Sequence, residues 1–254
     1  MTNKVNLIID VGNTTIVFGF FNGEELVKKL ITYTHSRSEK EKLTMLKNFV
    51  SENNLSVEKG MIFSVVPRAN KPLSKLIKKV FGFSLPFFNW EEHEYKDKIP
   101  EITDKIGGDL LADLIAAKTY YKSPALIFDL GTVTKLLSVN KEQKFVGASF
   151  IPGMNSALTM FSRRAAMLPD HTKLSRAKKD VGLNTVECMQ HGVYWSTVSY
   201  IEKQIELQGK ATVILTGGNA SFVKDEFKDI IYDPDLTLKG MNLMFEEMQK
   251  WQSI

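Results

Sequence analysis

Two carboxylates in this chain each end an apolar run and are followed by glycine and threonine. Asp10 lies in LIIDVGNTT (residues 7–15) and Asp129 lies in LIFDLGTVT (residues 126–134). Glycine lets the backbone approach a phosphate, and the N–H groups and threonine hydroxyls of such a turn donate to phosphate oxygens. The carboxylate can hold Mg²⁺, which in turn holds the phosphates. An ordinary hairpin explains one copy equally well, but two copies favour two related halves that grip one nucleotide.

Other sites of chemistry are excluded by their missing motifs. The chain has no Gly-x-x-x-x-Gly-Lys-Ser/Thr P-loop, no Gly-x-Gly-x-x-Gly dinucleotide motif and no Gly-x-Ser-x-Gly nucleophile elbow. Its four histidines show no metal-ligand spacing: His35, His93, His171 and His191. The single Cys188 excludes an internal disulfide and a cysteine-based zinc site. We expect it to be an inert, half-buried thiol on a helix.

The composition is that of an ordinary globular protein. The 254 residues are 43% hydrophobic and 24% charged, with a net charge of +4. Lysine and glutamate are dispersed, so no nucleic-acid partner is expected. No apolar run is long enough to span a bilayer, and Met1 leads into a short strand rather than a signal peptide. We therefore expect a cytoplasmic protein without a membrane partner.

The elements that position these carboxylates follow one order twice. The first half predicts strands over 5–10, 15–21 and 26–32, a charged helix over 38–53, a strand over 60–66 and a helix over 71–80. After a helix over 107–121, the second half predicts strands over 125–130, 133–139 and 144–150, helices over 155–166 and 184–208, a strand over 211–215 and a helix over 237–251.

This order predicts an α/β protein built from two duplicated ribonuclease-H-like domains with a nucleotide cleft between them. The domains are expected to span residues 1–122 and 123–254, because the strand pattern restarts at residue 125. No low-complexity linker separates the two halves, so they are expected to pack closely. The aromatic stretch 81–95 is expected either to cover the core or to form an interface.

The two turns, with a later Thr-Gly-Gly turn, resemble the acetate kinase/hexokinase/actin/Hsp70 superfamily. Within it the chain resembles type III pantothenate kinases along nearly its full length. The segments that carry the resemblance are IDVGNT (9–14), FSVVP (63–67), IGGD (106–109), DLGTVT (129–134), IPG (151–153), RAAMLP (164–169), NTVECMQHG (184–192) and TGG (216–218). Each motif is weak alone, and their common order and spacing are specific.

The resemblance implies ATP-dependent phosphorylation of pantothenate, the first step toward coenzyme A, by a homodimer. The residues implied to contact ATP are Asp10, Gly12, Asn13, Thr14, Thr15, Thr132, Gly217 and Gly218, with Asp10 also at the Mg²⁺. Asp129 is implied to bind a monovalent cation, K⁺ or NH₄⁺. The residues implied to bind pantothenate are Gly107, Gly108, Asp109, Leu110 and Thr185, the last near the subunit interface.

Asp109 matches the family's general base, which accepts the proton of the pantothenate hydroxyl. Phosphoryl transfer needs alignment and charge neutralisation more than covalent help, so one carboxylate near the acceptor suffices. Asp109 is expected at a helix start, where the helix dipole favours negative charge. The structural alternative is a plain helix N-cap.

The substrate half of the site departs from the family pattern. Leu110 stands where the family has arginine, PEIT (100–103) replaces a Tyr-x-Asn-Pro loop, and Val146-Gly147 replaces Gly-Gly. Leucine offers none of arginine's donors to an anion. The cations that could compensate are Lys105, Lys135, Arg163 and Arg164. Three hypotheses stay open: an active pantothenate kinase, an impaired nucleotide-binding regulatory relative, and a kinase for another small hydroxy acid or sugar.

Overall fold

The computed structural model describes residues 3–35, 38–89, 107–165, 167–170, 173–178 and 180–251. Its contacts divide the chain into two compact units. Unit 1 comprises Met1–Ala116 and Thr237–Ile254, and unit 2 comprises Ala117–Leu236. The change from unit 1 to unit 2 thus falls a few residues before the expected boundary at residue 122, and the C-terminal helix has its contacts in unit 1. The division at residue 122 stays a proposal for the domain boundary.

Unit 1 is built on a four-stranded sheet of order β3-β2-β1-β4. The strands are β1 (Asn3–Val11), β2 (Thr15–Asn22), β3 (Glu25–Tyr33) and β4 (Leu55–Ser64). β1 is antiparallel to β2 and parallel to β4. The helices are α1 (Glu39–Glu52), α2 (Pro67–Phe81), α4 (Gly108–Tyr120), which ends in unit 2, and α8 (Leu236–Trp251), whose first residue belongs to unit 2.

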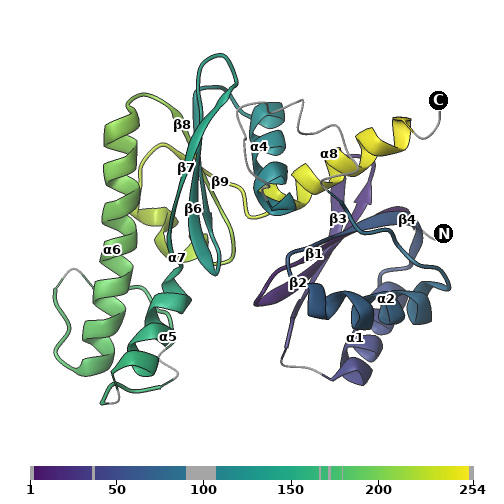
Figure 1. Ribbon diagram of the computed structural model, residues 1–254, viewed down its shortest axis with the longest axis horizontal. Coiled ribbons are helices and arrows are strands. Elements are labelled where there is room, and N and C mark those ends of the chain that lie inside the picture. The colour runs from purple at the N-terminus through teal and green to yellow at the C-terminus, as the bar shows by residue number, and fades with distance from the viewer. Residues whose placement is uncertain are drawn as a thin grey trace. The chain divides into compact units, whose positions relative to one another are not determined.

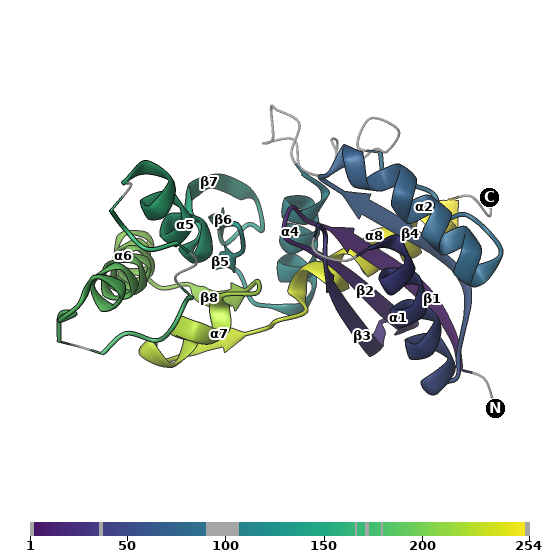
Figure 2. The same cartoon turned by 90° about the horizontal axis from the view of Figure 1, so that it is seen from below.

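Helices cover both faces of this sheet (Figure 2). Leu7 and Ile9 of β1 lie in one apolar core with residues of α1 and α2. On the other face α8 contacts the strands: the Asn6 side chain donates to Glu246 over 2.6 Å, and the Lys59 ammonium lies 5.5 Å from the Phe245 ring centre. Burial on both faces explains why the middle of β1 is a continuous apolar run, Leu7 to Ile9, rather than an alternating one.

Local signals set the ends of the first two helices. Ser38 and Glu41 form a reciprocal capping box at the start of α1. Pro67 occupies the first turn of α2, where its missing N–H costs nothing, and Gly82 ends the helix with a left-handed φ of 85°. Helix α1 lies close to its expected range, whereas α2 begins at Pro67 rather than at residue 71 and β4 begins at Leu55 rather than at residue 60.

Unit 2 repeats the arrangement with one more strand, in the order β7-β6-β5-β8-β9. The strands are β5 (Ala125–Leu130), β6 (Val133–Val139), β7 (Phe145–Pro152), β8 (Thr212–Thr216) and β9 (Ile230–Tyr232). β5 is antiparallel to β6 and parallel to β8, as β1 is to β2 and β4. The mixed α/β fold with a repeated sheet is as predicted.

Among the described residues of unit 2, four helical segments accompany the second sheet. They are α5 (Met154–Arg164), α6 (Thr185–Gln208), α7 (Ala220–Val223) and the 3₁₀ turn η2 (Lys224–Glu226). The long helix α6 runs beside the sheet (Figure 1), and Tyr194 and Val198 pack in one core with Phe128 and Leu130. β9, α7 and η2 were not predicted, because three or four residues are too short to show a period.

Two further expectations are decided by burial. Phe81, Phe83 and Phe87 pack against the core of unit 1, so the described part of the aromatic stretch covers the core; residues 90–95 lie outside the described part.

The prediction of a half-buried Cys188 was wrong. Its thiol is exposed on α6 and donates to the Gly182 carbonyl over 3.2 Å, because the core face of this turn is taken by Met189.

Candidate active site

The turn between β1 and β2, called the first turn below, is held by hydrogen bonds from the residue that follows β3. The Gly12 N–H donates to the Thr15 carbonyl over 2.9 Å, and the Thr34 hydroxyl donates to the Gly12 carbonyl over 2.7 Å. The Thr34 N–H donates to the Thr14 carbonyl over 2.9 Å. Asn13 and Thr14 are exposed at its tip. A turn fixed through its carbonyls keeps its exposed side chains in place for a ligand.

Asp10 lies at the end of β1, in register with Val17 of β2 and Phe63 of β4. Its side chain is half-buried. No group of three or more carboxylate, histidine or cysteine side chains that could hold a metal occurs among the described residues. Mg²⁺ is usually bound by one or two carboxylates together with substrate phosphates, so the donor set at Asp10 fits that ion.

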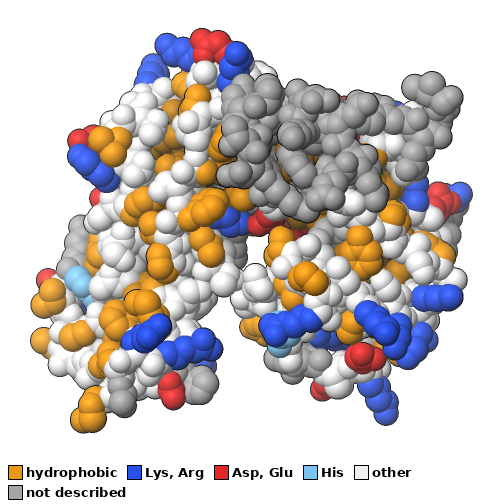
Figure 3. Space-filling view, viewed as in Figure 1, with side chains coloured by type: hydrophobic (Ala, Val, Ile, Leu, Met, Phe, Trp, Pro, Cys, Tyr) orange, Lys and Arg blue, Asp and Glu red, His pale blue; other side chains and the backbone are white. Residues whose placement is uncertain are grey.

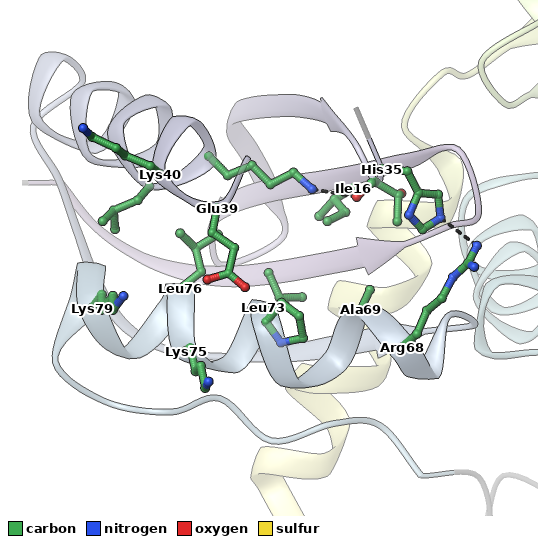
Figure 4. A pocket seen from close by; sticks show the side chains of 14 residues that line it. Ile16, His35, Glu39, Lys40, Arg68, Ala69, Leu73, Lys75, Leu76 and Lys79 are labelled. Carbon is green, nitrogen blue, oxygen red and sulfur yellow. Dashed lines mark hydrogen bonds between the residues drawn. The ribbon is translucent and has the colours of Figure 1, made fainter. Parts of the chain in front are cut away.

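Lys42 of α1 supports the first turn indirectly, through Thr34. Its ammonium donates to the Thr34 carbonyl over 2.6 Å, and burial lowers the pKa of this lysine. It lines a groove of about 580 Å³ between α1 and α2 (Figure 4), over which lysine and arginine side chains gather (Figure 3). Arg68 Nη2 lies 3.0 Å from His35 Nε2 in this groove. Thr34 lines the groove, but no residue of the first turn does, and none of the predicted site residues lines it.

The predicted general base, Asp109, lies near the end of the sheet at which Asp10 is found. The Gly107 carbonyl accepts the first bond of α4, from the Leu111 N–H over 3.2 Å, so Gly107 is the N-cap and Asp109 lies in the first turn. Asp109 is therefore not the N-cap residue of α4. A Cβ at Gly108 would lie 3.2 Å from the Phe63 ring, and Phe63 is the β4 neighbour of Asp10. Asp10 and Asp109 therefore lie at one end of the sheet of unit 1.

Leu110 is half-buried in the first turn of α4. Of the cations that could compensate for it, Lys105 lies outside the described residues. Lys135 is paired with Asp129, and Arg163 and Arg164 are exposed at the end of α5 in unit 2. The departure at Leu110 therefore has no described compensation within unit 1.

The second turn places its carboxylate between two polar residues. Asp129 is in register with Lys135 of β6 and Thr216 of β8. The Lys135 ammonium lies 2.6 Å from Asp129 Oδ2, and the two side chains are only 13% and 11% exposed. On the other side, Gly217 has a φ of 85°, and a side chain there would collide with Asp129 Oδ1 and the Leu130 backbone. The sequence pattern did not foresee this ion pair.

A network of amides fixes the backbone of the second turn. The Asn219 side chain donates to the Gly131 carbonyl over 3.1 Å and accepts from Asn155 over 2.9 Å. The Thr132 carbonyl accepts from the Ser156 hydroxyl over 2.7 Å and from the Gly153 N–H over 3.1 Å. Sequence reasoning missed Asn155 and Asn219, although Asn219 directly follows the Thr-Gly-Gly turn that it singled out.

Two buried hydroxyls near this turn have no hydrogen-bond partner within the part of the chain that is described. They belong to Thr134 and Thr216. Thr216 is the β8 neighbour of Asp129. A buried hydroxyl without a partner costs free energy, commonly about 1–3 kcal/mol, so this position favours a bound water, ion or ligand. Gly218 is exposed just beyond it.

Thr185, the remaining predicted substrate contact, is the first residue of α6 and is exposed. Asn184 caps the helix by accepting from the Glu187 N–H over 3.0 Å, and Glu187 accepts from the Leu183 N–H over 3.0 Å. The hydrogen bond from the Leu183 N–H, together with a contribution from the Asn184 side chain, lowers the pKa of the Glu187 carboxyl group. Thr185 therefore lies on a well-capped helix start in unit 2, whereas Asp109 lies in unit 1.

Solved structures with the same fold include proteins of other activities. A putative Baf family transcriptional activator from Campylobacter jejuni superposes with a TM-score of 0.57 at 19% identity, covering 96% of this chain and 99% of that one. An activator of 2-hydroxyisocaproyl-CoA dehydratase from Clostridium difficile, with bound ADPNP, superposes with a TM-score of 0.57 at 11% identity, covering 98% and 97%. At these identities the likeness shows the fold alone.

Sequence comparison gives the family. A type III pantothenate kinase from Exiguobacterium sp. is 30% identical over 253 residues, which cover 96% of this chain and 99% of the relative. A family profile described as Type III pantothenate kinase matches residues 6–207. This span contains both carboxylate turns, the start of α4 and the start of α6. The chain belongs to the type III pantothenate kinase family.

Proposed function

We propose that this protein transfers the γ-phosphoryl group of ATP to the hydroxyl of pantothenate, giving 4′-phosphopantothenate, the first step of coenzyme A biosynthesis. The observation that carries the proposal is the family match over residues 6–207, which includes Asp10 and Asp109. The fixed turn at Gly12 and the position of Asp109 in the first turn of α4 support it.

In the proposed reaction, ATP binds the residues that the family resemblance assigns to it. Asn13, Thr14, Thr15 and Thr132 donate to phosphate oxygens, and Gly217 and Gly218 border the adenosine. Asp10 would hold Mg²⁺, and the bound ion would neutralise phosphate charge. Gly107, Gly108 and Thr185 position pantothenate, and Asp109 accepts the hydroxyl proton as the new P–O bond forms.

The test is a coupled assay of ADP release with ATP, Mg²⁺ and pantothenate, with the phosphorylated product identified by mass. We expect turnover by the wild type and a loss of about 10²–10⁴-fold in Asp109→Ala, the usual contribution of a general base. Asp170→Asn, at an exposed carboxylate of unit 2, is the control and should match the wild type. Full activity of Asp109→Ala would remove Asp109 from the base role.

Leu110 favours a second candidate, a relative that binds nucleotide and regulates other proteins without turning over pantothenate. A rise of the melting temperature with ATP and Mg²⁺ but no product from pantothenate would support it. A panel of small hydroxy acids and sugars in the same assay tests the third hypothesis, a kinase with another acceptor. If the pantothenate kinase proposal holds, Leu110→Arg should tighten pantothenate binding.

We also propose that the protein acts as a homodimer in the cytoplasm, with small molecules and a second copy as its partners and neither nucleic acid nor membrane among them. Unit 2 exposes apolar side chains on two strands of its sheet and before α6, at Val133, Val146, Phe150, Val181 and Leu183. Exposed apolar surface of this kind is typical of interfaces. No helix in the described part of the chain has the length and apolarity to cross a membrane. Sedimentation analysis tests the dimer.

The monovalent cation implied at Asp129 does not fit the residues present. The Asp129 carboxylate already contacts the Lys135 ammonium at 2.6 Å. ATP and Mg²⁺ therefore remain the proposed cofactors, and K⁺ or NH₄⁺ is not assigned a place at Asp129.

A further inference from the structure

We infer that Lys135 supplies the monovalent cation of this site from within the chain, so that neither nucleotide binding nor phosphoryl transfer depends on added K⁺ or NH₄⁺. This inference rests on the proposed function, because it concerns the carboxylate that the family resemblance assigns to a cation.

The first support is register. Asp129 and Lys135 are directly opposed on the antiparallel strands β5 and β6, so their side chains leave the same face of the sheet. The ion pair of 2.6 Å is therefore set by the backbone pairing of two central strands. It does not depend on a flexible surface side chain finding a partner.

The second support is burial. The side chains of Lys135 and Asp129 are 13% and 11% exposed. Removing either charge from such a site leaves the other without compensation, which is strongly unfavourable. A cation from solution would have to displace the ammonium and leave it in a mostly buried place. The tethered ammonium has the advantage of being held next to the carboxylate at a high effective concentration.

The third support is chemical identity. A lysine ammonium carries one positive charge and three N–H donors, as the bound end of an ammonium ion does. On the opposite side of Asp129, the Gly217 backbone approaches Oδ1 so closely that a Cβ would collide with it. The carboxylate is thus flanked by the ammonium on one side and by backbone on the other.

The residues around Asp129 also predict which cation site would form if the Lys135 ammonium were removed. Asp129 would keep its carboxylate, and Thr216 offers a buried hydroxyl in register with it on β8. Oxygen ligands of this kind suit a hard monovalent cation. Lys135→Met retains much of the length of the side chain without its charge, so this variant should acquire a need for a cation from solution.

The experiment compares wild type, Lys135→Met and the control Lys141→Met in buffers of matched ionic strength containing KCl, NH₄Cl or tetramethylammonium chloride. Lys141 lies exposed in the turn between β6 and β7. We expect wild type and Lys141→Met to phosphorylate pantothenate at rates within about twofold across the three salts. Lys135→Met should be about tenfold or more faster in KCl or NH₄Cl than in tetramethylammonium chloride, since tenfold corresponds to only 1.4 kcal/mol.

Thermal unfolding gives a readout without activity. The melting temperature of wild type should be the same in KCl and tetramethylammonium chloride, whereas that of Lys135→Met should rise in KCl. The double variant Asp129→Asn/Lys135→Met lacks the carboxylate, and its melting temperature should not distinguish the salts. If wild type turns over no pantothenate in any salt, the proposed function fails, and the melting comparison still decides the role of Lys135.

Two results would overturn the inference. One is a wild-type rate or melting temperature that K⁺ or NH₄⁺ raises strongly over tetramethylammonium. The other is a Lys135→Met variant that folds, as its melting transition shows, but responds to the three salts as wild type does.

Discussion

Asp10 and Asp129 occupy the same place in two copies of one fold, yet their neighbours differ. Asp10 is in register with Val17 and Phe63, whereas Asp129 is in register with Lys135 and Thr216. The first carboxylate has apolar cross-strand neighbours and the second has an ammonium and a hydroxyl. The repeated motif therefore sets the place of each carboxylate, and the adjacent strands set what that carboxylate can bind.

The difference begins in the turns. Asp10 pairs with Val17, seven residues later (17 − 10), and Asp129 pairs with Lys135, six residues later (135 − 129). One residue of offset reverses which side chains of the returning strand share the face of the carboxylate. Duplication of the fold thus preserved the strand order while the two turns acquired different chemistry.

The largest expected contrast comes from removing each carboxylate. Asp129→Ala leaves the Lys135 ammonium mostly buried without its partner and should cost about 3 kcal/mol or more of unfolding free energy. Asp10→Ala should instead weaken the binding of ATP in the presence of Mg²⁺ by at least about a hundredfold, because the metal loses its protein ligand. Chemical denaturation and calorimetric titration with ATP and Mg²⁺ measure the two effects. Unchanged nucleotide affinity in Asp10→Ala would contradict the metal placement.

Glycine replacements sharpen the same contrast. Gly217→Ala should lose roughly 2 kcal/mol of stability, because an L residue is strained at positive φ and its Cβ meets Asp129 and Leu130. Gly218→Ala is the matched control, since open space surrounds its Cβ position, and should change stability by less than about 0.5 kcal/mol. Urea denaturation distinguishes them. Equal losses in both variants would show that the approach to Asp129 is not what requires Gly217.

Val17→Lys makes the first turn resemble the second. An ammonium on the residue opposite Asp10 would compete with Mg²⁺, and we expect MgATP affinity to fall about tenfold, or 1.4 kcal/mol. Val17→Met controls for side-chain length. Calorimetry at fixed free Mg²⁺ measures the affinity; an unchanged value for Val17→Lys would mean that the cross-strand neighbour does not control the metal site.

The smallest effect concerns Glu187, a carboxylate of unit 2 that accepts a hydrogen bond from the Leu183 N–H at the start of α6. Its pKa is lowered in the folded protein, so its contribution to the start of α6 is present above the unfolded value of about 4.3 and is lost as pH falls through the lower folded value. Amide exchange at Leu183, corrected for intrinsic rates, should speed up in acid. Glu187→Gln should remove that pH dependence; an unaltered acid response in this variant would assign it to another group.

Much of the fold was predictable from local signals. The apolar runs around Asp10 and Asp129 identified both central hairpins, and Pro67 and the glycine at residue 82 marked the ends of α2. The Gly-Gly-Asp motif located the start of α4. The ion pair was not predictable, because the offset that pairs Asp129 with Lys135 rather than Thr134 depends on the geometry of the turn. Asn155 and Asn219 are 64 residues apart, and no periodicity links them.

The sequence by itself determined the family, the repeated sheet order and the two carboxylates at the ends of β1 and β5, because apolar periodicity and short motifs are local properties. Only the tertiary structure decided which residues face those carboxylates. Strand register and the packing of the Gly217 turn bring together residues far apart in the chain, and the charge balance at Asp129 follows from that proximity.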